Sequence, residues 1–165
     1  SGAGLYVGHH IALLQLMKAA GVQMTYIPEQ GGTDAMTSVI SGKIMAGFNN
    51  LSDAFRNKDR LKILGIADTE RDKEFLPDVP TFKELGYPQV DDTSVNLRGI
   101  ALPKGTDKAI VDKAAAIVLK MFQSPKIKES MAMGGCGMKV MSREQVIQMF
   151  NNRQKTLLEL FPKKS

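Results

Sequence analysis

The sequence predicts an α/β fold with a mainly parallel sheet. Three observations point to it: short β-rich or apolar segments alternate with segments of helical periodicity, glycines or capping residues separate them, and there is no internal repeat. The 165 residues are 43% hydrophobic and 24% charged, which excludes a disordered or collagen-like chain. One cysteine excludes an internal disulfide framework, and no apolar run approaches the roughly 18 residues that cross a membrane.

Five segments are expected to be strands, because they alternate between apolar and polar residues or are apolar almost throughout. They are residues 22–27, 43–48, 61–67, 92–102 and 137–141. The third reads Leu-Lys-Ile-Leu-Gly-Ile-Ala, which is typical of a strand covered on both faces. In the fourth, Gly99 is expected to mark a bend.

Helical periodicity predicts the helices of the first half of the chain. The first runs from about residue 8 to residue 20, where Gly21 would end it. Short helices are expected to follow over 33–42 and 52–55, each after a side chain that can accept an unpaired backbone N–H. The capping candidates are Thr33 or Asp34, Ser52 or Asp53, and, further on, Thr81 with Glu84 in a capping box that Gly86 terminates.

The second half of the chain predicts three helices in succession. Residues 106–122 carry one continuous apolar face and form the clearest helix of the sequence. Pro125 fits the first turn of the next helix, which would end at Gly134. Ser142 and Gln145 match a capping box at the start of the last helix.

Charge is unevenly distributed along the chain. Residues 1–95 hold 9 Lys/Arg against 12 Asp/Glu, a net of −3, and residues 96–165 hold 13 against 5, a net of +8. Such asymmetry is found in nucleic-acid-binding arms, but these lysines punctuate an apolar helical pattern and no aromatic residues interleave with them. We therefore interpret the basic half as a solvated helix face, expect no nucleic-acid partner, and take the break near residue 95 as a change of lobe.

Histidine and cysteine give little support for metal or enzyme chemistry. His9 and His10 are adjacent, so on a helix they point about 100° apart and cannot chelate one metal, and we expect no metal site. His10 is expected near the helix start, in a pocket wall or hydrogen-bonded to backbone. Cys136 would follow a helix C-terminus, where the dipole disfavours a thiolate, so it is expected to be inert.

Two glycine-bearing turns, each before a predicted helix, suggest a site for a carboxylate or phosphate. They read Gly2-Ala3-Gly4-Leu5-Tyr6-Val7-Gly8 and Gln30-Gly31-Gly32-Thr33. Glycines let a backbone approach a ligand, and free N–H groups at a helix start attract anions. Ordinary turn chemistry explains the same pattern equally well. Asn49 and Asn50 follow a predicted strand, where a ligand crevice opens in parallel sheets, although an Asx turn is as good an interpretation.

Five motifs, in this order, resemble the C-terminal half of the solute-binding receptors of tripartite tricarboxylate transporters, also called Bug-type receptors. The motifs are Ser1-Gly-Ala-Gly with His10, Ile-Pro-Glu-Gln-Gly-Gly-Thr-Asp-Ala over 27–35, Ser-Gly-Lys-Ile-Met-Ala-Gly-Phe-Asn-Asn over 41–50, Leu-Pro-Asp-Val-Pro-Thr-Phe-Lys-Glu-Leu-Gly over 76–86, and Arg-Gly-Ile-Ala-Leu-Pro-Lys-Gly-Thr over 98–106. The resemblance covers nearly the whole chain.

The resemblance implies a type II periplasmic-binding-protein fold, in which two α/β lobes close on a small organic acid. Residues 1–95 would be one nearly complete lobe without its N-terminal elements, and 96–165 the crossover strand and C-terminal helices of the other lobe. The implied protein is a periplasmic or otherwise extracytoplasmic receptor without catalysis or cofactor, and it delivers a carboxylate to membrane permease subunits. The implied ligand-binding residues are Gly4, Tyr6, Val7, Gly8, His10, Gln30, Gly31, Gly32, Thr33, Asn49 and Asn50.

Two departures from the family pattern accompany the resemblance. Family members are nearly twice this length, so the apolar faces of the last helices need a partner, either the missing N-terminal half or a second copy of the chain. The first ligand loop usually reads Gly-x-Gly-Ser, whereas this chain has Gly4-Leu5-Tyr6-Val7. The small hydroxyl-bearing turn of the family is thus replaced by a bulky apolar one, in which Tyr6 is expected either to stack on a less polar solute or to close the site.

Two other classes of function are alternatives to this receptor. The first is the effector-sensing domain of a transcription regulator, which shares the bilobed fold. The second is an enzyme that uses His10 or Cys136. The sequence starts at Ser1-Gly2-Ala3-Gly4 with no export signal, an observation that a mature or truncated chain would share.

Overall fold

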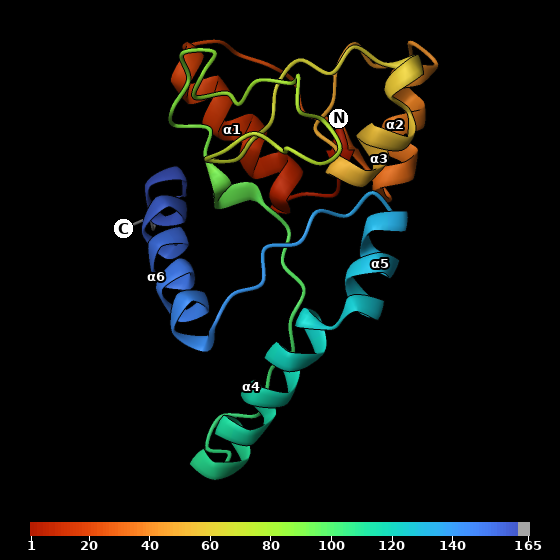
Figure 1. Cartoon of the computed structure of the whole chain (residues 1–165). Coiled ribbons are helices and arrows are strands. Elements are labelled where there is room, and N and C mark those ends of the chain that lie inside the picture. Colours follow the sequence, from red (N-terminus) through yellow and green to blue (C-terminus); the bar gives the residue numbers. More distant parts are fainter. Residues whose placement is uncertain (162–165) are drawn as a thin grey trace. The chain divides into compact units, whose positions relative to one another are not determined.

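The computed structural model describes residues 1–161 and separates into two compact units, Ser1–Asn96 and Leu97–Ser165 (Figure 1). The first unit contains two short strands and the helices α1 to α3, and the second contains α4 to α6. Among the described helices, none has the length and apolar composition that spanning a membrane requires.

The first unit is organised by a parallel pair of two-residue strands, β1 (Gly2–Ala3) and β2 (Pro28–Glu29). A loop leads from β1 into α1 (Gly8–Ala20), and a shorter one leads from β2 into α2 (Gly32–Ile40). Because the two strands are parallel, both loops leave the pair at its carboxyl edge. This edge is where open α/β sheets bind ligands.

The core of the first unit lies along α1 and α2. Its buried apolar side chains come from these helices and from the irregular segment that follows them: Ile11, Ala12, Leu13, Ala35, Met36, Leu76 and Val90. Two short elements pack on the helices, since α3 (Leu51–Arg56) contacts α2 and the 3₁₀ turn η2 (Asp92–Ser94) contacts α1. A further 3₁₀ turn, η1 (Lys58–Arg60), follows α3.

The five strand predictions are wrong for this chain. In residues 1–161 the named strands are β1 and β2, and the segment 61–67 contributes a single parallel bridge, from Ile66 to Thr81. The segment 92–102 begins as the 3₁₀ turn η2. Extended segments become strands only when neighbouring backbone accepts and donates their hydrogen bonds. Consistent with missing neighbours, Val22 is 43% exposed and Leu64 62% exposed.

The helix predictions succeed best where the signals are local. Helix α1 has the predicted bounds, and Gly21 ends it in the left-handed conformation at φ 64°, donating to the Met17 carbonyl. The predicted caps of the next two helices are wrong, because the residues with extended backbone are Gly31 before α2 and Asn50 before α3. The predicted caps Thr33, Asp34, Ser52 and Asp53 lie within the helices, and α2 ends at Ile40, two residues before the expected Gly42.

The predicted capping box at Thr81 and Glu84 forms, but on a turn and not on a helix. The Thr81 N–H donates to Glu84 Oε2 at 2.8 Å, and the Glu84 N–H donates to Thr81 Oγ1 at 3.2 Å. Arg71 Nε also donates to both carboxylate oxygens at 2.9 Å. This hydrogen bond from Arg71, with those from Thr81, holds the pKa of Glu84 at about 2.

The second unit consists of α4 (Lys108–Gln123), α5 (Pro125–Met133) and α6 (Arg143–Leu160), close to the predicted ranges. The expected strand over 137–141 is the irregular link between the last two. No residue of these three helices is buried within the described chain. Large apolar side chains on them are exposed, among them Ile110 and Phe150 at 58% each. This apolar surface is not buried within the described residues.

The capping box of α6 gives a prediction about stability. Ser142 Oγ accepts the Gln145 N–H at 3.3 Å, and Gln145 Oε1 accepts the Ser142 N–H at 2.8 Å. Ser142→Ala is expected to lower the free energy of unfolding by about 1 kcal/mol, the usual value of an N-cap. Urea titration followed by circular dichroism measures this. Ser130→Ala, an exposed position within α5, is the control and is expected to be neutral or slightly stabilising. Equal losses in the two variants would contradict the prediction.

Candidate functional site

The loop from β1 to α1 is held in shape by backbone and side-chain hydrogen bonds. Gly4 has a φ of 74°, its N–H donates to the Glu29 carbonyl at 3.0 Å, and its carbonyl accepts the Tyr26 hydroxyl at 2.8 Å. Tyr6 also has positive φ, 59°, and its N–H donates to His10 Nδ1 at 3.1 Å. The loop therefore has a fixed backbone path that begins at the strand pair and ends on the first turn of α1.

His10 supports this loop from α1. Its ring stacks on Tyr26, with the centroids 4.4 Å apart and an interplanar angle of 18°, and its Nδ1 accepts the Tyr6 N–H. The expected hydrogen bond between His10 and the backbone is thus present, with His10 as the acceptor. Partial burial lowers the pKa of His10 from its usual 6.5, so the ring is neutral at pH 7.

Both glycine-bearing loops end in a helix start that lacks a side-chain cap. Val7 precedes α1 and Gly31 precedes α2, and neither contributes a side-chain hydrogen bond to the first turn. In the second unit, by contrast, Asp107, Ser124 and Ser142 each cap a helix through a side-chain oxygen. The first N–H groups of a helix have no partner inside the helix and carry its positive dipole end. The carboxyl edge of the strand pair therefore presents two helix starts whose N–H groups suit an anion.

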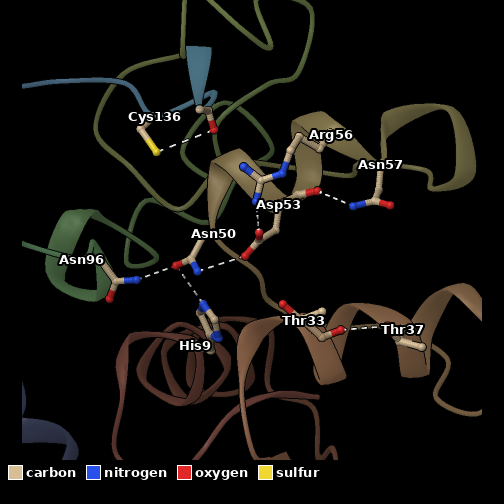
Figure 2. A network of polar contacts seen from close by, with 10 residues as sticks. His9, Thr33, Thr37, Asn50, Asp53, Arg56, Asn57, Asn96 and Cys136 are labelled. Atoms are coloured by element: carbon tan, nitrogen blue, oxygen red, sulfur yellow. Dashed lines mark hydrogen bonds and ion pairs between the residues drawn. The ribbon is translucent and has the colours of Figure 1, made fainter. Parts of the chain in front are cut away.

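Asn50 lies beside the start of α2 and is held there on several sides (Figure 2). Its Oδ1 accepts from Asn96 Nδ2 and lies 3.3 Å from His9 Nε2, and its Nδ2 donates to Asp53 Oδ2 at 3.2 Å. A methyl group on Gly32 would come within 3.4 Å of this Nδ2 and within 3.2 Å of the Asp53 carboxylate. The side chain of Asn50 is thus fixed in direct proximity to the second glycine loop.

His9 completes this cluster and is not among the predicted site residues. It is 8% exposed, and its Nδ1 accepts the Ala3 N–H at 3.0 Å. Since Nδ1 is an acceptor, the proton of the neutral ring is on Nε2, which donates to Asn50 Oδ1. Burial lowers the pKa of His9, and the hydrogen bond that His9 donates to Asn50 opposes that effect. A signal existed, because His9 precedes the buried Ala12 and Leu13 by one helical turn and so shares the core-facing side of α1.

The acidic group of the cluster has its own counterion. Arg56 Nη2 lies 2.5 Å from Asp53 Oδ1, one turn along α3, and the Asp53 carboxylate lies near the start of α2 (Figure 2). Asp34 lies in the first turn of α2, and Glu29 ends β2. Negative side chains thus outnumber positive ones around the second glycine loop.

The structure brings together some of the predicted site residues and leaves others apart. Gly4, Tyr6 and His10 are joined on the first loop, and Asn50 adjoins Gly32 on the second. The other predicted residues are partly or fully exposed and lie on these loops or in the first turns of α1 and α2: Val7, Gly8, Gln30, Gly31 and Thr33. Asn49 is separate from the Asn50 cluster, and its Oδ1 is buried without a hydrogen-bond partner among the described residues.

Metal and thiol chemistry find no support in the residues that the structure describes. Within 1–161, no group of three His, Cys, Asp or Glu side chains is placed to hold a metal ion. Cys136 follows α5, as predicted, and its Sγ lies 3.7 Å from the Gly134 carbonyl oxygen (Figure 2). That contact is local and gives the thiol no base.

Comparison with known proteins decides the family. The sequence profile of the tripartite tricarboxylate transporter family receptors, TctC, matches residues 1–162. The chain belongs to this family. It is 32% identical over 124 residues to the UPF0065 protein in the gbd 5' region of Cupriavidus necator. This match covers 74% of this chain and 37% of that protein. It is 30% identical over 125 residues to BugT of Bordetella pertussis, with the same two shares. TctC proteins are solute-binding receptors and not enzymes.

Solved structures show the same α/β fold. A TctC solute-binding protein from Polaromonas matches with a TM-score of 0.73 at 22% identity, over 99% of this chain and 56% of its own. MatC from Rhodopseudomonas palustris with bound malate matches with a TM-score of 0.69 at 23% identity, over 96% and 54%. This TctC chain therefore spans little more than half the length of these structures and 37% of the curated relatives.

Proposed function

We propose that this TctC chain captures a small organic acid, held by a carboxylate, at the carboxyl edge of β1 and β2. The observation that carries the proposal is the pair of glycine loops that leave this edge and end in helix starts without side-chain caps. Two neighbours in the same fold are described with bound dicarboxylates, MatC with malate and the R. palustris protein Rpa4515 with adipate. A carboxylate is the ligand group that such helix starts favour.

Each predicted site residue has a role in this proposal. The backbone N–H groups of the two loops hold the carboxylate, and the glycines let it approach. The amides of Asn49 and Asn50 supply further donors and acceptors at the same edge. Tyr6 and Val7 provide the apolar wall, and His10 keeps the first loop in place. The backbone contributors are Gly8, Gln30, Gly31, Gly32 and Thr33. Gly4, whose N–H donates to the Glu29 carbonyl, shapes the first loop.

The proposal extends to the rest of the receptor. We place it in the periplasm, where it would deliver solute to the permease subunits of a tripartite transporter, the kind of transporter after which its family is named. The first unit would be the second ligand-binding lobe, and the second unit the crossover segment and returning helices of the other lobe. The unburied faces of α4 to α6 would pack on the N-terminal half of the receptor or on a second copy. The family match favours this receptor over the regulator and enzyme alternatives.

A titration with paired ligands tests the carboxylate site. Calorimetry with succinate, malate, adipate, citrate and benzoate is expected to show binding of at least one acid. The matching neutral amide, for example succinamide beside succinate, is expected to bind at least about tenfold more weakly, because it lacks the charge that the helix starts favour. Absence of binding by every acid would refute the proposal.

Gly31→Asp sharpens this test, because stability and binding should change in opposite directions. The position precedes α2 with a φ of −162°, and nothing lies within 4 Å of an added Cβ. An aspartate there supplies the missing cap and is expected to raise the free energy of unfolding by a few tenths of a kcal/mol. The same carboxylate occupies the N–H groups and repels a ligand anion, so acid affinity should fall about tenfold or more. Gly31→Asn also caps α2 but carries no charge, so it shows how much of the loss comes from occupied N–H groups and how much from charge repulsion. Unchanged acid affinity in both variants would show that the acid binds elsewhere.

A further inference from the structure

Three consecutive large apolar residues are exposed on the loop between β1 and α1. Leu5 is 53% exposed, Tyr6 70% and Val7 41%. Single exposed apolar residues are ordinary, but a run of three on a loop that borders a ligand edge is a contiguous apolar surface. A polar or glycine-rich loop would present none of this surface to a solute.

The backbone holds Tyr6 in a conformation that costs free energy. A φ of 59° is rare for a bulky residue other than glycine, asparagine or aspartate. The Tyr6 N–H donates to His10 Nδ1, the Tyr6 and His10 ring centroids lie 5.6 Å apart, and His10 stacks on Tyr26. Tyr26 in turn donates its hydroxyl to the Gly4 carbonyl. This chain of contacts holds the backbone of the loop, and the exposed ring of Tyr6 lies next to His10.

Charge near the loops limits what an acid can gain from ion pairing. The first 56 residues contain three basic residues, Lys18, Lys43 and Arg56, and none belongs to a glycine loop. Arg56 is paired with Asp53. Lys18 lies in the last turn of α1, at the opposite end from its start. On this side of the site an acid is held by backbone N–H groups, so contact with the apolar loop contributes a correspondingly larger share of affinity and specificity.

We propose that Tyr6 is a specificity-determining residue, which selects carboxylates with an aromatic body over short, fully polar di- and tricarboxylates. The inference rests on the proposed function and names the solute class of that site. The carboxylate would lie at the helix starts, and the ring of the solute would pack in an offset or edge-to-face arrangement on Tyr6, flanked by Leu5 and Val7.

The test compares benzoate with succinate by calorimetry on the full chain and on two variants. Tyr6→Phe keeps the ring and should change the benzoate Kd by less than about threefold, whereas Tyr6→Asn removes the ring and should weaken benzoate about tenfold. Asparagine tolerates positive φ, so the loop backbone should persist, and thermal unfolding checks this. Succinate has no ring to pack on Tyr6, so Tyr6→Asn should weaken it by a smaller factor than it weakens benzoate.

The outcomes separate the two proposals. Benzoate binding that exceeds succinate binding and depends on the ring of Tyr6 supports the inference. Preference for succinate or citrate in the wild type, or benzoate binding that survives Tyr6→Asn, overturns the inference and leaves the carboxylate receptor intact. Failure of every acid to bind the wild type overturns both.

Discussion

Replacing Gly8 with alanine is expected to lower the free energy of unfolding by about 2 kcal/mol, within the range of substitutions that overpack a rigid site. An added Cβ would lie 2.2 Å from the carbonyl oxygen of Ser94. This contact is with backbone, so no side-chain rotation relieves it, and either α1 or the segment around η2 must move. Moving that segment also disturbs the hydrogen bond from Asn96 to Asn50. The small gain in helix propensity from alanine is too weak to compensate.

Gly99→Ala is the matched control for this prediction. Nothing lies within 4 Å of a Cβ at Gly99, and its φ is outside the left-handed region. The control is expected to change stability by less than about 0.5 kcal/mol, or to raise it slightly by restricting the unfolded chain. Chemical denaturation of the two variants gives the comparison. A Gly8→Ala variant as stable as Gly99→Ala would show that α1 does not pack closely on the Ser94 backbone.

The helices could be predicted from sequence because their signals are local. The bonds of α1 and the reciprocal cap at Ser142 and Gln145 join residues three or four apart, so composition and spacing contain the needed information. The cap of α2 could not be predicted in this way. Helix α2 begins after Gly31, the last residue with extended backbone. Glycine has no side chain that would mark this position in the sequence.

The strands could not be predicted, because a strand depends on residues elsewhere in the chain. The segment 61–67 has a composition typical of a covered strand, yet only Ile66 finds a backbone partner, in Pro80, Thr81 and Phe82. The apolar pattern predicts an extended, buried segment. A neighbouring segment of the chain must provide both the hydrogen-bond partners and the cover. Half of a typical receptor of this family offers fewer neighbours.

The candidate site was predicted in part. Glycines before helices are visible in sequence, and both loops lie at the edge where the parallel pair ends. The cluster that fixes Asn50 was not visible, because His9 lies 41 positions from Asn50, and Asn96 lies 46 positions beyond it. Contacts at such separations follow from packing and not from local spacing.

Removing the ring of His9 is expected to have the largest effect of any single side chain in this cluster. His9→Ala leaves the Ala3 N–H without its acceptor and removes the Nε2 donor from Asn50, at a largely buried position. Unsatisfied buried groups and the remaining cavity should lower the free energy of unfolding by about 3 kcal/mol. His9→Gln keeps a donor at the position of Nε2 and should recover about 1 kcal/mol of this loss. Equal losses in both variants would show that the bond to Asn50 contributes nothing.

The same residue should make stability depend on pH, with a sign fixed by its lowered pKa. Unfolded His9 takes up a proton near its usual pKa of 6.5, whereas the folded side chain resists protonation because burial disfavours the charge and Nδ1 already accepts the Ala3 N–H. The contribution of His9 to the free energy of unfolding is therefore complete above pH 6.5, and it is lost as the pH falls toward the pKa of His9 in the folded chain. Denaturation at a series of pH values should show this loss in the wild type and a smaller one in His9→Gln. His10→Gln controls for the second histidine, whose pKa is also lowered by burial. A wild-type pH dependence that His9→Gln leaves unchanged would assign the lost stability to other groups.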